Sequence, residues 1–181
     1  MKKLYYTWSD IQHMCVGISM QMYKDNWRPD YIVGITRGGA IPAVILSHLT
    51  DIPMRPLEVS LRDGGQCVSD LGIAEDAFGV VSPEEQLTLK SRWDISKRKN
   101  ILVIDDINDT GATFNWIKED WSSGCFPNED SAWNSVWGKN VRFAVLTNNL
   151  SSKFDEVSYY STEVNKAEED VWLVYPWEQS E

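Results

Sequence analysis

Three carboxylates, a glycine and two threonines follow a short apolar run in the stretch ILVIDDINDTGATF, residues 101–114. Where such a loop joins a strand to a helix, the unpaired N–H groups of the helix's first turn and the helix dipole attract an anion. Gly111 allows close approach of a ligand, and the hydroxyls of Thr110 and Thr113 add hydrogen-bond donors. The DTGAT segment is therefore a candidate phosphate-binding loop.

The acids Asp105, Asp106 and Asp109 would repel a bare phosphate, so the ligand must also carry groups that carboxylates bind. Sugar hydroxyls and a divalent cation are such groups, and Mg²⁺ is usually held by one or two carboxylates together with substrate phosphates. An acidic surface turn with a helix-capping aspartate explains any one of these acids but poorly explains all three. The pattern indicates a sugar phosphate with free hydroxyls and bound Mg²⁺.

A second strand–turn–helix pattern occurs in YIVGITRGGAIPA, residues 31–43. The guanidinium of Arg37 is permanently charged and matches phosphate oxygens in a fork, while Gly38 lets backbone amides approach the same group. A glycine turn with a surface arginine would be the better interpretation if this motif stood alone.

The segment ILVIDDINDTGAT closely resembles the phosphoribosyl-pyrophosphate signature of the type I phosphoribosyltransferases. The resemblance implies that Asp105 and Asp106 bind the ribose hydroxyls, directly or through Mg²⁺. It also implies that the amides of the phosphate loop hold the 5′-phosphate; this loop comprises Asp109, Thr110, Gly111, Ala112 and Thr113. Aspartate at the fifth loop position is typical of 6-oxopurine enzymes, which act on hypoxanthine, guanine or xanthine. Asp109 would be the catalytic acid/base at purine nitrogen 7.

The turn GITRGGAIPA resembles the diphosphate-binding loop of bacterial xanthine–guanine and archaeal hypoxanthine–guanine enzymes. The resemblance implies that Arg37 and Gly38 bind the leaving diphosphate, and it predicts a non-proline cis peptide at Thr36–Arg37.

The segment DVWLVYPWE, residues 170–178, is similar to the ending of archaeal enzymes and their yeast relatives. On this resemblance Trp172 stacks on the purine, the carbonyl of Leu173 accepts a hydrogen bond from the base, and Glu178 helps to hold a second Mg²⁺ through water. Strand packing is the alternative for Trp172 and for Trp177, and a solvated surface acid is the alternative for Glu178.

Two features depart from the family pattern. Enzymes for 6-oxopurines carry a lysine after the strand that follows the phosphate-loop helix, whereas the alignment of FAVLTNNLSSKFD places Asn149 there, with Lys153 nearby. A neutral amide replaces a charge-assisted bond at the base, so altered base preference stays an alternative. The sequence also does not decide which basic residue closes over the diphosphate; the candidates are Arg62, Lys90 and Arg92.

The periodicity predicts an α/β fold: a mainly parallel twisted sheet flanked by helices, with a small hood. Residues 1–181 are expected to form a single domain, with a core of about 8–150 and a hood from 151–181 and possibly the N-terminus. A capping box at Thr7 begins a helix. Predicted strands are 31–36, part of 54–61, 101–104, 141–147, 156–161 and 171–177, and predicted helices include 41–49 and one from 114 to 121.

Two segments lack clear periodicity. Residues 62–98 are polar and are interpreted as a long functional or mobile loop. Residues 122–140 are interpreted as an insertion, in which Trp133 and Trp137 line a subunit contact or cover the core.

The composition excludes several classes of function. A net charge of −10 disfavours nucleic acids and anionic membranes as partners. Three widely spaced cysteines indicate neither a disulfide framework nor a zinc site, and two histidines cannot form a three-histidine metal site. With no signal-peptide pattern, we expect a soluble cytoplasmic protein, a homodimer or homotetramer, that acts on small molecules.

The leading hypothesis is a Mg²⁺-dependent purine phosphoribosyltransferase of purine salvage, with phosphoribosyl pyrophosphate as co-substrate. One rival is a non-catalytic regulator that binds phosphoribosyl pyrophosphate. Another is the diphosphokinase that makes this metabolite, but the short chain of 181 residues without an internal repeat weighs against it.

Overall fold

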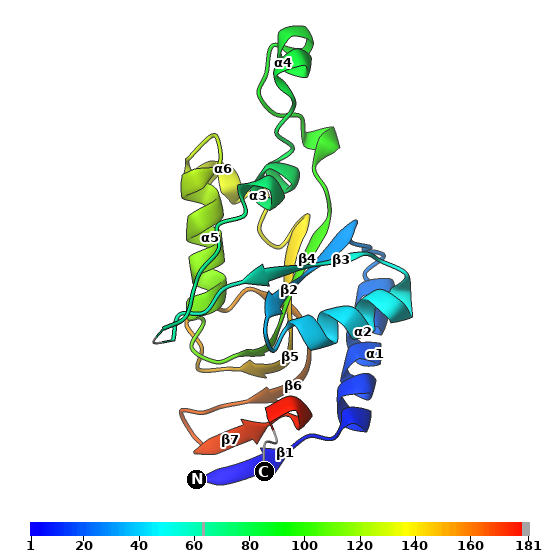
Figure 1. Cartoon of the computed structure of the whole chain (residues 1–181), viewed down its shortest axis with the longest axis vertical. Coiled ribbons are helices and arrows are strands. Elements are labelled where there is room, and N and C mark those ends of the chain that lie inside the picture. The colour runs from blue at the N-terminus through cyan, green and yellow to red at the C-terminus, as the bar shows by residue number, and fades with distance from the viewer. Residues whose placement is uncertain (63, 179–181) are drawn as a thin grey trace.

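The computed structural model describes residues 1–62 and 64–178, and it confirms the α/β prediction. The strands are β1 (Lys2–Tyr5), β2 (Tyr31–Thr36), β3 (Met54–Glu58), β4 (Ile101–Asn108), β5 (Val141–Asn149), β6 (Val157–Val164) and β7 (Val171–Val174). The helices are α1 (Trp8–Lys24), α2 (Ala40–Thr50), α3 (Leu71–Phe78), α4 (Pro83–Leu89), α5 (Ala112–Gly124) and α6 (Asp130–Trp133). Five strands form one parallel sheet in the order β3-β2-β4-β5-β6 (Figure 1).

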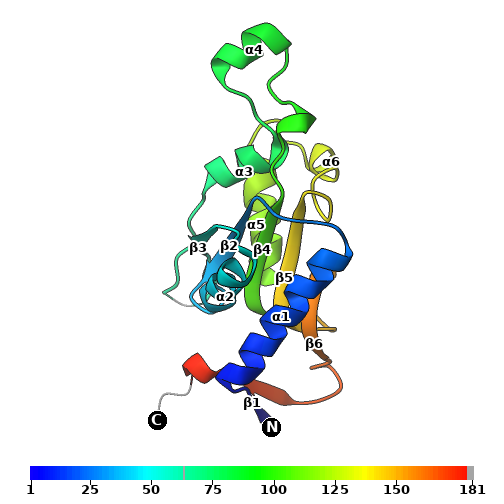
Figure 2. The ribbon, with the colours of Figure 1, turned by 90° about the vertical axis from the view of Figure 1, so that its right-hand side faces the viewer.

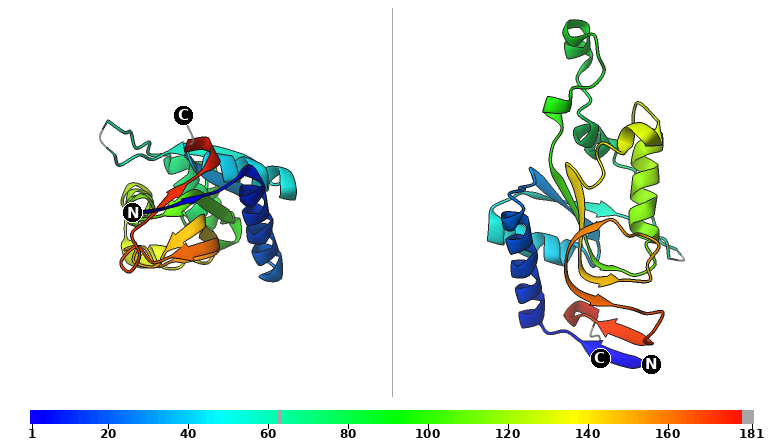
Figure 3. Two further views of the ribbon diagram at one scale, coloured as in Figure 1. Left: turned by 90° about the horizontal axis from the view of Figure 1, so that it is seen from below. Right: turned by 180° about the vertical axis from the view of Figure 1, so that it is seen from behind.

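Helices cover both faces of this sheet, which explains why residues 101–104 of β4 are apolar and buried at every position. Along β2, Ile32 joins a core with α1 and α2, while Tyr31, Val33 and Ile35 point the other way and join a core with α3, α5 and α6. Figures 2 and 3 show α1 and α2 on one side of the sheet and α5 on the other. The predicted capping box is present, since Thr7 Oγ1 accepts from Asp10 N and Asp10 accepts from Thr7 N.

The strand order creates a crevice between the ends of β2 and β4. The chain leaves β2 through α2 toward β3, and it leaves β4 through α5 toward β5, on the opposite side. In open parallel sheets, ligands bind at the carboxyl ends of strands where the connections diverge in this way. The two glycine-bearing turns follow β2 and β4, so the fold brings both to this crevice.

The hood is a separate two-stranded parallel sheet, in which β1 pairs with β7. Residues 157–164, assigned to the hood from sequence, instead form β6 and extend the main sheet by pairing with β5. Aromatic rings reinforce the hood: Tyr6 stacks on Tyr175 with centroids 5.3 Å apart, and Tyr175 stacks on Trp177 at 4.9 Å.

The interpretation of residues 62–98 as one long loop is wrong, because the segment contains α3 and α4. Helix α3 buries Ile73, Ala74 and Phe78 in the core. Helix α4 buries no residue; it projects from the body of the protein (Figure 1), with a capping box between Ser82 and Glu85 at its start. An exposed helix gives no amphipathic pattern, and this accounts for the failure to predict α4.

Of the two interpretations of Trp133 and Trp137, the structure supports core packing. Trp133 is fully buried and Trp137 is 9% exposed. Their rings stack with centroids 5.1 Å apart, and Trp137 also contacts Trp121 of α5 at 5.9 Å. Residues 122–140 therefore complete the core beyond the end of α5. Among the described residues, no helix is long and apolar enough to cross a membrane.

The three free thiols differ in environment, which gives a first prediction. Burial raises the pKa of Cys15 to about 12 and that of Cys125 to about 11, whereas Cys67 is partly exposed. Because the thiolate is the reactive form, we expect one fast-reacting thiol in the native protein near pH 8 and three after denaturation. Titration with a chromogenic disulfide measures this. Cys67→Ser should abolish the fast phase, and equal native reaction rates for all three thiols would contradict the assignment.

Candidate active site at the carboxyl ends of β2 and β4

The acid pair, Asp105 and Asp106, belongs to the end of strand β4. The sequence had indicated a loop at these residues, so that prediction is wrong. Strand β4 continues through Asn108 because β5 is long enough to pair with it, with Ile107 opposite Thr147 and Asn108 opposite Asn148. Asp105 and Asp106 consequently have extended backbones supported by the sheet. Their positions are defined more rigidly than a loop would allow.

Each acid of this pair is oriented by a backbone amide. Asp106 N donates to Asp105 Oδ1 at 2.9 Å, and Ile107 N donates to Asp106 Oδ1 at 2.8 Å. Burial raises the pKa of both carboxyls, and the charge of Asp106 raises that of Asp105 further. Two adjacent, partly buried carboxylates favour a ligand that brings hydroxyl donors or a cation.

The phosphate loop, residues 109–113, joins β4 to α5. Gly111 is the N-cap of α5 and has φ +88°, and a Cβ there would lie 2.5 Å from Phe154 N. Thr110 Oγ1 accepts from Ala112 N at 3.3 Å. The first N–H groups of this 13-residue helix therefore lie at the crevice. Such groups at a helix N-terminus stabilise an anion.

The turn after β2 packs directly against the acid pair. The predicted cis peptide at Thr36–Arg37 is present. A Cβ on Gly38 would lie 2.2 Å from Asp106 Oδ2, and a Cβ on Gly39 would lie 2.5 Å from Ile104 O. At Gly39 a side chain would therefore meet backbone atoms, whereas at Gly38 it would meet only the Asp106 carboxylate. The backbone of this turn borders the same space as the carboxylates.

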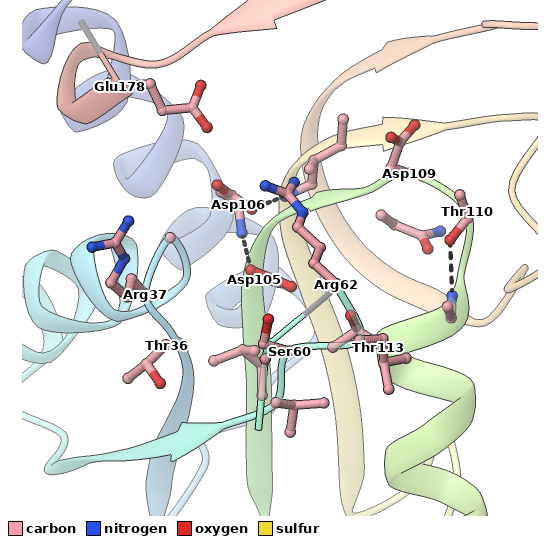
Figure 4. Close-up of a pocket in the computed structure, with 18 of the residues that line it drawn as sticks. Thr36, Arg37, Ser60, Arg62, Asp105, Asp106, Asp109, Thr110, Thr113 and Glu178 are labelled. Atoms are coloured by element: carbon pink, nitrogen blue, oxygen red, sulfur yellow. Dashed lines mark hydrogen bonds between the residues drawn. The ribbon is translucent and has the colours of Figure 1, made fainter. Parts of the chain in front are cut away.

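These elements enclose one large cavity of about 2070 Å³. Small-molecule sites usually measure roughly 300–1,000 Å³, so there is room for two substrates at once. Arg37, Gly38, the acid pair and the phosphate loop line the cavity, and the hood supplies Trp172, Trp177 and Glu178. Figure 4 shows Arg37, the acid pair, Asp109 and Glu178 around this space.

The hood residues differ in how they meet the cavity. Trp172 is 51% exposed, which leaves a ring face open, whereas the side chain of Leu173 is buried in the core and only its neighbours line the cavity. The carboxylate of Glu178 lies near enough to Asp106 to raise the pKa of that residue, an effect smaller than that of burial. Glu178 also accepts a hydrogen bond from Tyr175 N at 3.3 Å.

Of the three basic residues considered for the diphosphate, the cavity contains Arg62. Its guanidinium faces the acid pair (Figure 4), and its charge opposes the upward shift of the Asp105 pKa. Arg92 lies elsewhere, over the ring of Phe126 at 3.8 Å. Lys90 caps the end of α4, on the part that projects from the body.

The side-chain amide of Asn149 is hydrogen-bonded to other parts of the protein. Its side chain is 5% exposed, and its Nδ2 donates to the carbonyl of Asp109 at 2.8 Å. Its Oδ1 accepts from Ser151 N, Ser151 Oγ and Lys166 N at 3.2, 2.9 and 3.0 Å. The amide that was expected to contact a base is thus engaged with the phosphate loop and with the turn before β7.

Two supporting residues were missed from sequence. The hydroxyl of Tyr175 is buried; it donates to the carbonyl of Asp106 at 3.1 Å and lies 3.1 Å from Thr147 Oγ1. Asn108 Nδ2 donates to Phe154 O and to Asn148 Oδ1, both at 2.9 Å. A signal existed, because polar residues at the ends of apolar strands need internal partners once buried.

The donor set suits Mg²⁺ better than a tightly caged metal. Within residues 1–62 and 64–178, no group of three or more His, Cys, Asp or Glu side chains forms a ready metal cage. Mg²⁺ typically keeps several waters and takes one or two carboxylates together with substrate oxygens. Asp105 and Asp106, with Glu178 across the cavity, match that requirement.

The sequence of residues 5–176 matches the family model for the phosphoribosyl transferase domain. The chain belongs to this family. It is 28% identical to a hypoxanthine-guanine phosphoribosyltransferase of Schizosaccharomyces pombe, over 97% of this chain and 89% of the relative. It is 24% identical to xanthine phosphoribosyltransferase 1 of Saccharomyces cerevisiae, over 98% of this chain and 90% of the relative.

Solved structures show the same fold. A purine phosphoribosyltransferase from Pyrococcus horikoshii superposes with a TM-score of 0.63 at 23% identity, covering 100% of this chain and 97% of that one. A xanthine-guanine-hypoxanthine phosphoribosyltransferase of Helicobacter pylori gives a TM-score of 0.64 at 15% identity, covering 98% and 94%. The family predicted from the ILVIDDINDTGAT and RGG motifs is confirmed.

The two glycines of the first turn make a matched pair for a second prediction. Gly39→Ala places a methyl group against backbone atoms of β2 and β4, so we expect a loss of about 1–3 kcal/mol in unfolding free energy. Gly38→Ala meets only the carboxylate of Asp106, which can rotate, so its unfolding transition should stay near wild type. Urea denaturation measures both. The reverse order of stability would contradict the packing described.

Proposed function

We propose that this protein transfers the phosphoribosyl group of phosphoribosyl pyrophosphate to a 6-oxopurine, giving a nucleoside monophosphate and diphosphate. The observation that carries the proposal is one cavity lined by an acid pair, a helix N-terminus and an exposed tryptophan. These groups suit ribose hydroxyls, a 5′-phosphate and a purine ring. The activities named for the two yeast relatives support the same substrate class.

The binding roles follow from the chemistry of each wall. The amides of residues 109–113 hold the 5′-phosphate at the start of α5. Asp105 and Asp106 take the ribose hydroxyls, directly or through Mg²⁺. Arg37 and the backbone at Gly38 hold the diphosphate, and Arg62 lies on the same cavity to cover it. When bound, Mg²⁺ supplies positive charge to the diphosphate oxygens, held through Asp106 and Glu178.

The base site lies between the hood and the phosphate loop. Trp172 offers a ring face for stacking, and the carbonyl of Leu173 accepts a hydrogen bond from the base. Nitrogen 9 of the purine forms a bond with C1′ of the ribose while the bond from C1′ to the diphosphate breaks. The proton on nitrogen 7 passes to the carboxylate of Asp109. Positioning and charge stabilisation supply most of the rate, because one acid/base group contributes about 10²–10⁴-fold.

The proposal includes a cellular setting: purine salvage by a cytoplasmic homodimer or homotetramer, with small molecules as its only substrates. The net charge of −10 and the absence of a predicted basic face agree with small-molecule substrates over nucleic acid.

The direct test is turnover of hypoxanthine, guanine, xanthine and adenine at fixed Mg²⁺ and phosphoribosyl pyrophosphate, with calorimetric titration of phosphoribosyl pyrophosphate in parallel. We expect binding of phosphoribosyl pyrophosphate, and diphosphate release with at least one 6-oxopurine. Binding without diphosphate release from any base would support the non-catalytic regulator instead.

A third prediction concerns Asp109, whose side chain is 46% exposed at the cavity. Asp109→Asn removes the proton acceptor but retains the shape of the loop, so kcat should fall by about 10²–10⁴-fold while phosphoribosyl pyrophosphate still binds. Steady-state kinetics and calorimetry measure the two effects. Glu119→Gln, on the exposed face of α5 outside the cavity, is the control and should retain full turnover. Near-full turnover of Asp109→Asn would refute the assigned role.

A further inference from the structure

The N-terminal strand contributes a positive charge to the hood. In the parallel pairing of β1 with β7, Lys3 lies opposite Trp172 and Tyr5 lies opposite Val174. Side chains alternate between the two faces of a strand, so these four residues share one face of the hood. All four line the large cavity. The strand next to the tryptophan on which the base is proposed to stack therefore carries the ammonium of Lys3.

The other face of β1 makes different contacts. Leu4 packs against the core that contains Val171. Lys2, on the same face as Leu4, pairs with Glu169 at 2.9 Å and does not line the cavity. Among the described residues, no ion pair includes Lys3. The two neighbouring lysines thus differ, because the ammonium of Lys3 borders the cavity and has no carboxylate partner within the described part of the chain.

The basic residues of the large cavity lie at two different ends. Among the residues that the structure describes, Lys3, Arg37 and Arg62 are the basic ones that line it. Arg37 follows β2 and Arg62 faces the acid pair (Figure 4), so both lie at the end proposed for the diphosphate. Lys153 and Lys166 line a smaller cavity of about 470 Å³ instead. Of these basic residues, Lys3 is the one beside the proposed base site.

We propose that Lys3 selects a purine with an oxygen at carbon 2, so that xanthine is the preferred base, an inference that rests on the proposed function. The group at carbon 2 lies on the edge of the purine opposite to nitrogen 7. With nitrogen 7 at Asp109 of the phosphate loop, carbon 2 points away from that loop and toward the hood. An ammonium has three donors and no acceptor, so it complements an oxygen and not an amino group.

The three 6-oxopurines differ at carbon 2. Xanthine has an oxygen there, guanine has an amino group and hypoxanthine has only hydrogen. The ammonium of Lys3 donates to the oxygen of xanthine, meets a second donor in guanine and has no partner in hypoxanthine. Xanthine is also the most acidic of the three bases. The positive charge of Lys3 attracts its anion and offsets the repulsion from Glu178 and the acid pair, which border the same cavity.

The test compares Lys3→Met with Lys2→Met in the full chain, because the two lysines are adjacent but lie on opposite faces of β1. Losing a charge-assisted hydrogen bond to the base should lower kcat/KM for xanthine by at least about tenfold in Lys3→Met, with kcat/KM for hypoxanthine within about twofold of wild type. Lys2→Met should leave both values near wild type. Lys3→Arg retains the charge and should retain most of the preference for xanthine.

Nucleotide binding gives a measurement that does not depend on turnover. Calorimetry should show that the wild-type protein binds xanthosine monophosphate more tightly than inosine monophosphate, and that Lys3→Met removes this difference. Lys2 and Lys3 are both exposed, so urea denaturation should give similar unfolding transitions for the two methionine variants. A loss confined to Lys3→Met would then come from the base site and not from unfolding.

Three results would overturn the role of Lys3. One is a wild-type preference for guanine over xanthine. Another is an unchanged ratio of the kcat/KM values for xanthine and hypoxanthine in Lys3→Met. The third is an equal fall with both bases, which would mean that Lys3 only supports the hood. Failure of the proposed function is distinguishable, because the wild-type protein would then release no diphosphate with any 6-oxopurine, while the nucleotide titrations would still report on Lys3.

Discussion

The parallel pairing of β2 with β4 is the constraint on which the site depends. Their register, from Tyr31 opposite Ile101 to Gly34 opposite Ile104, makes the two strands end at the same edge of the sheet. The turn after β2 then lies against the acids of β4, so closely that a Cβ on Gly38 would touch the Asp106 carboxylate and one on Gly39 would touch backbone atoms. Since the chain diverges on either side of this pair, the space above it stays open to a ligand.

Buried polar side chains link the end of the sheet to the surrounding loops by hydrogen bonds. Asn108 binds the segment after β5, Asn149 joins the phosphate loop to the turn before β7, and Tyr175 ties the hood to the backbone of Asp106. Each such bond contributes only about 0.5–1.5 kcal/mol net, but a buried partner left unpaired costs about 1–3 kcal/mol. The hood and the phosphate loop are consequently held in one relative position, as the proposed base site between them requires.

Sequence reasoning succeeded where the structure is determined locally. The ILVIDDINDTGAT motif predicted the strand, the glycine turn and the helix around residues 109–113, because all three are defined by neighbouring residues. Helix α4 was missed although Ser82 and Glu85 form its capping box, since no buried face gave a helical period. Strand β1 was missed because it pairs only with β7, at the other end of the chain.

The lysine that lies beside Asp109 was harder to predict for a similar reason. An alignment compares side chains that occupy corresponding positions on corresponding elements, and it therefore led to Asn149. The ammonium that reaches Asp109 belongs to a different element, and its approach depends on a turn whose geometry no local pattern encodes. Lys166, whose Nζ lies 2.9 Å from Asp109 Oδ1, is 17 positions away from Asn149 along the chain.

Whether one ligand spans both glycine-bearing turns is tested most directly by a crystal structure of the protein with Mg²⁺ and phosphoribosyl pyrophosphate. We predict that the 5′-phosphate lies on the amides of residues 109–113, that the ribose hydroxyls face Asp105 and Asp106, and that the diphosphate lies at Arg37 and Gly38. A 5′-phosphate bound instead in the smaller cavity, against Lys153 and Lys166, would contradict the account.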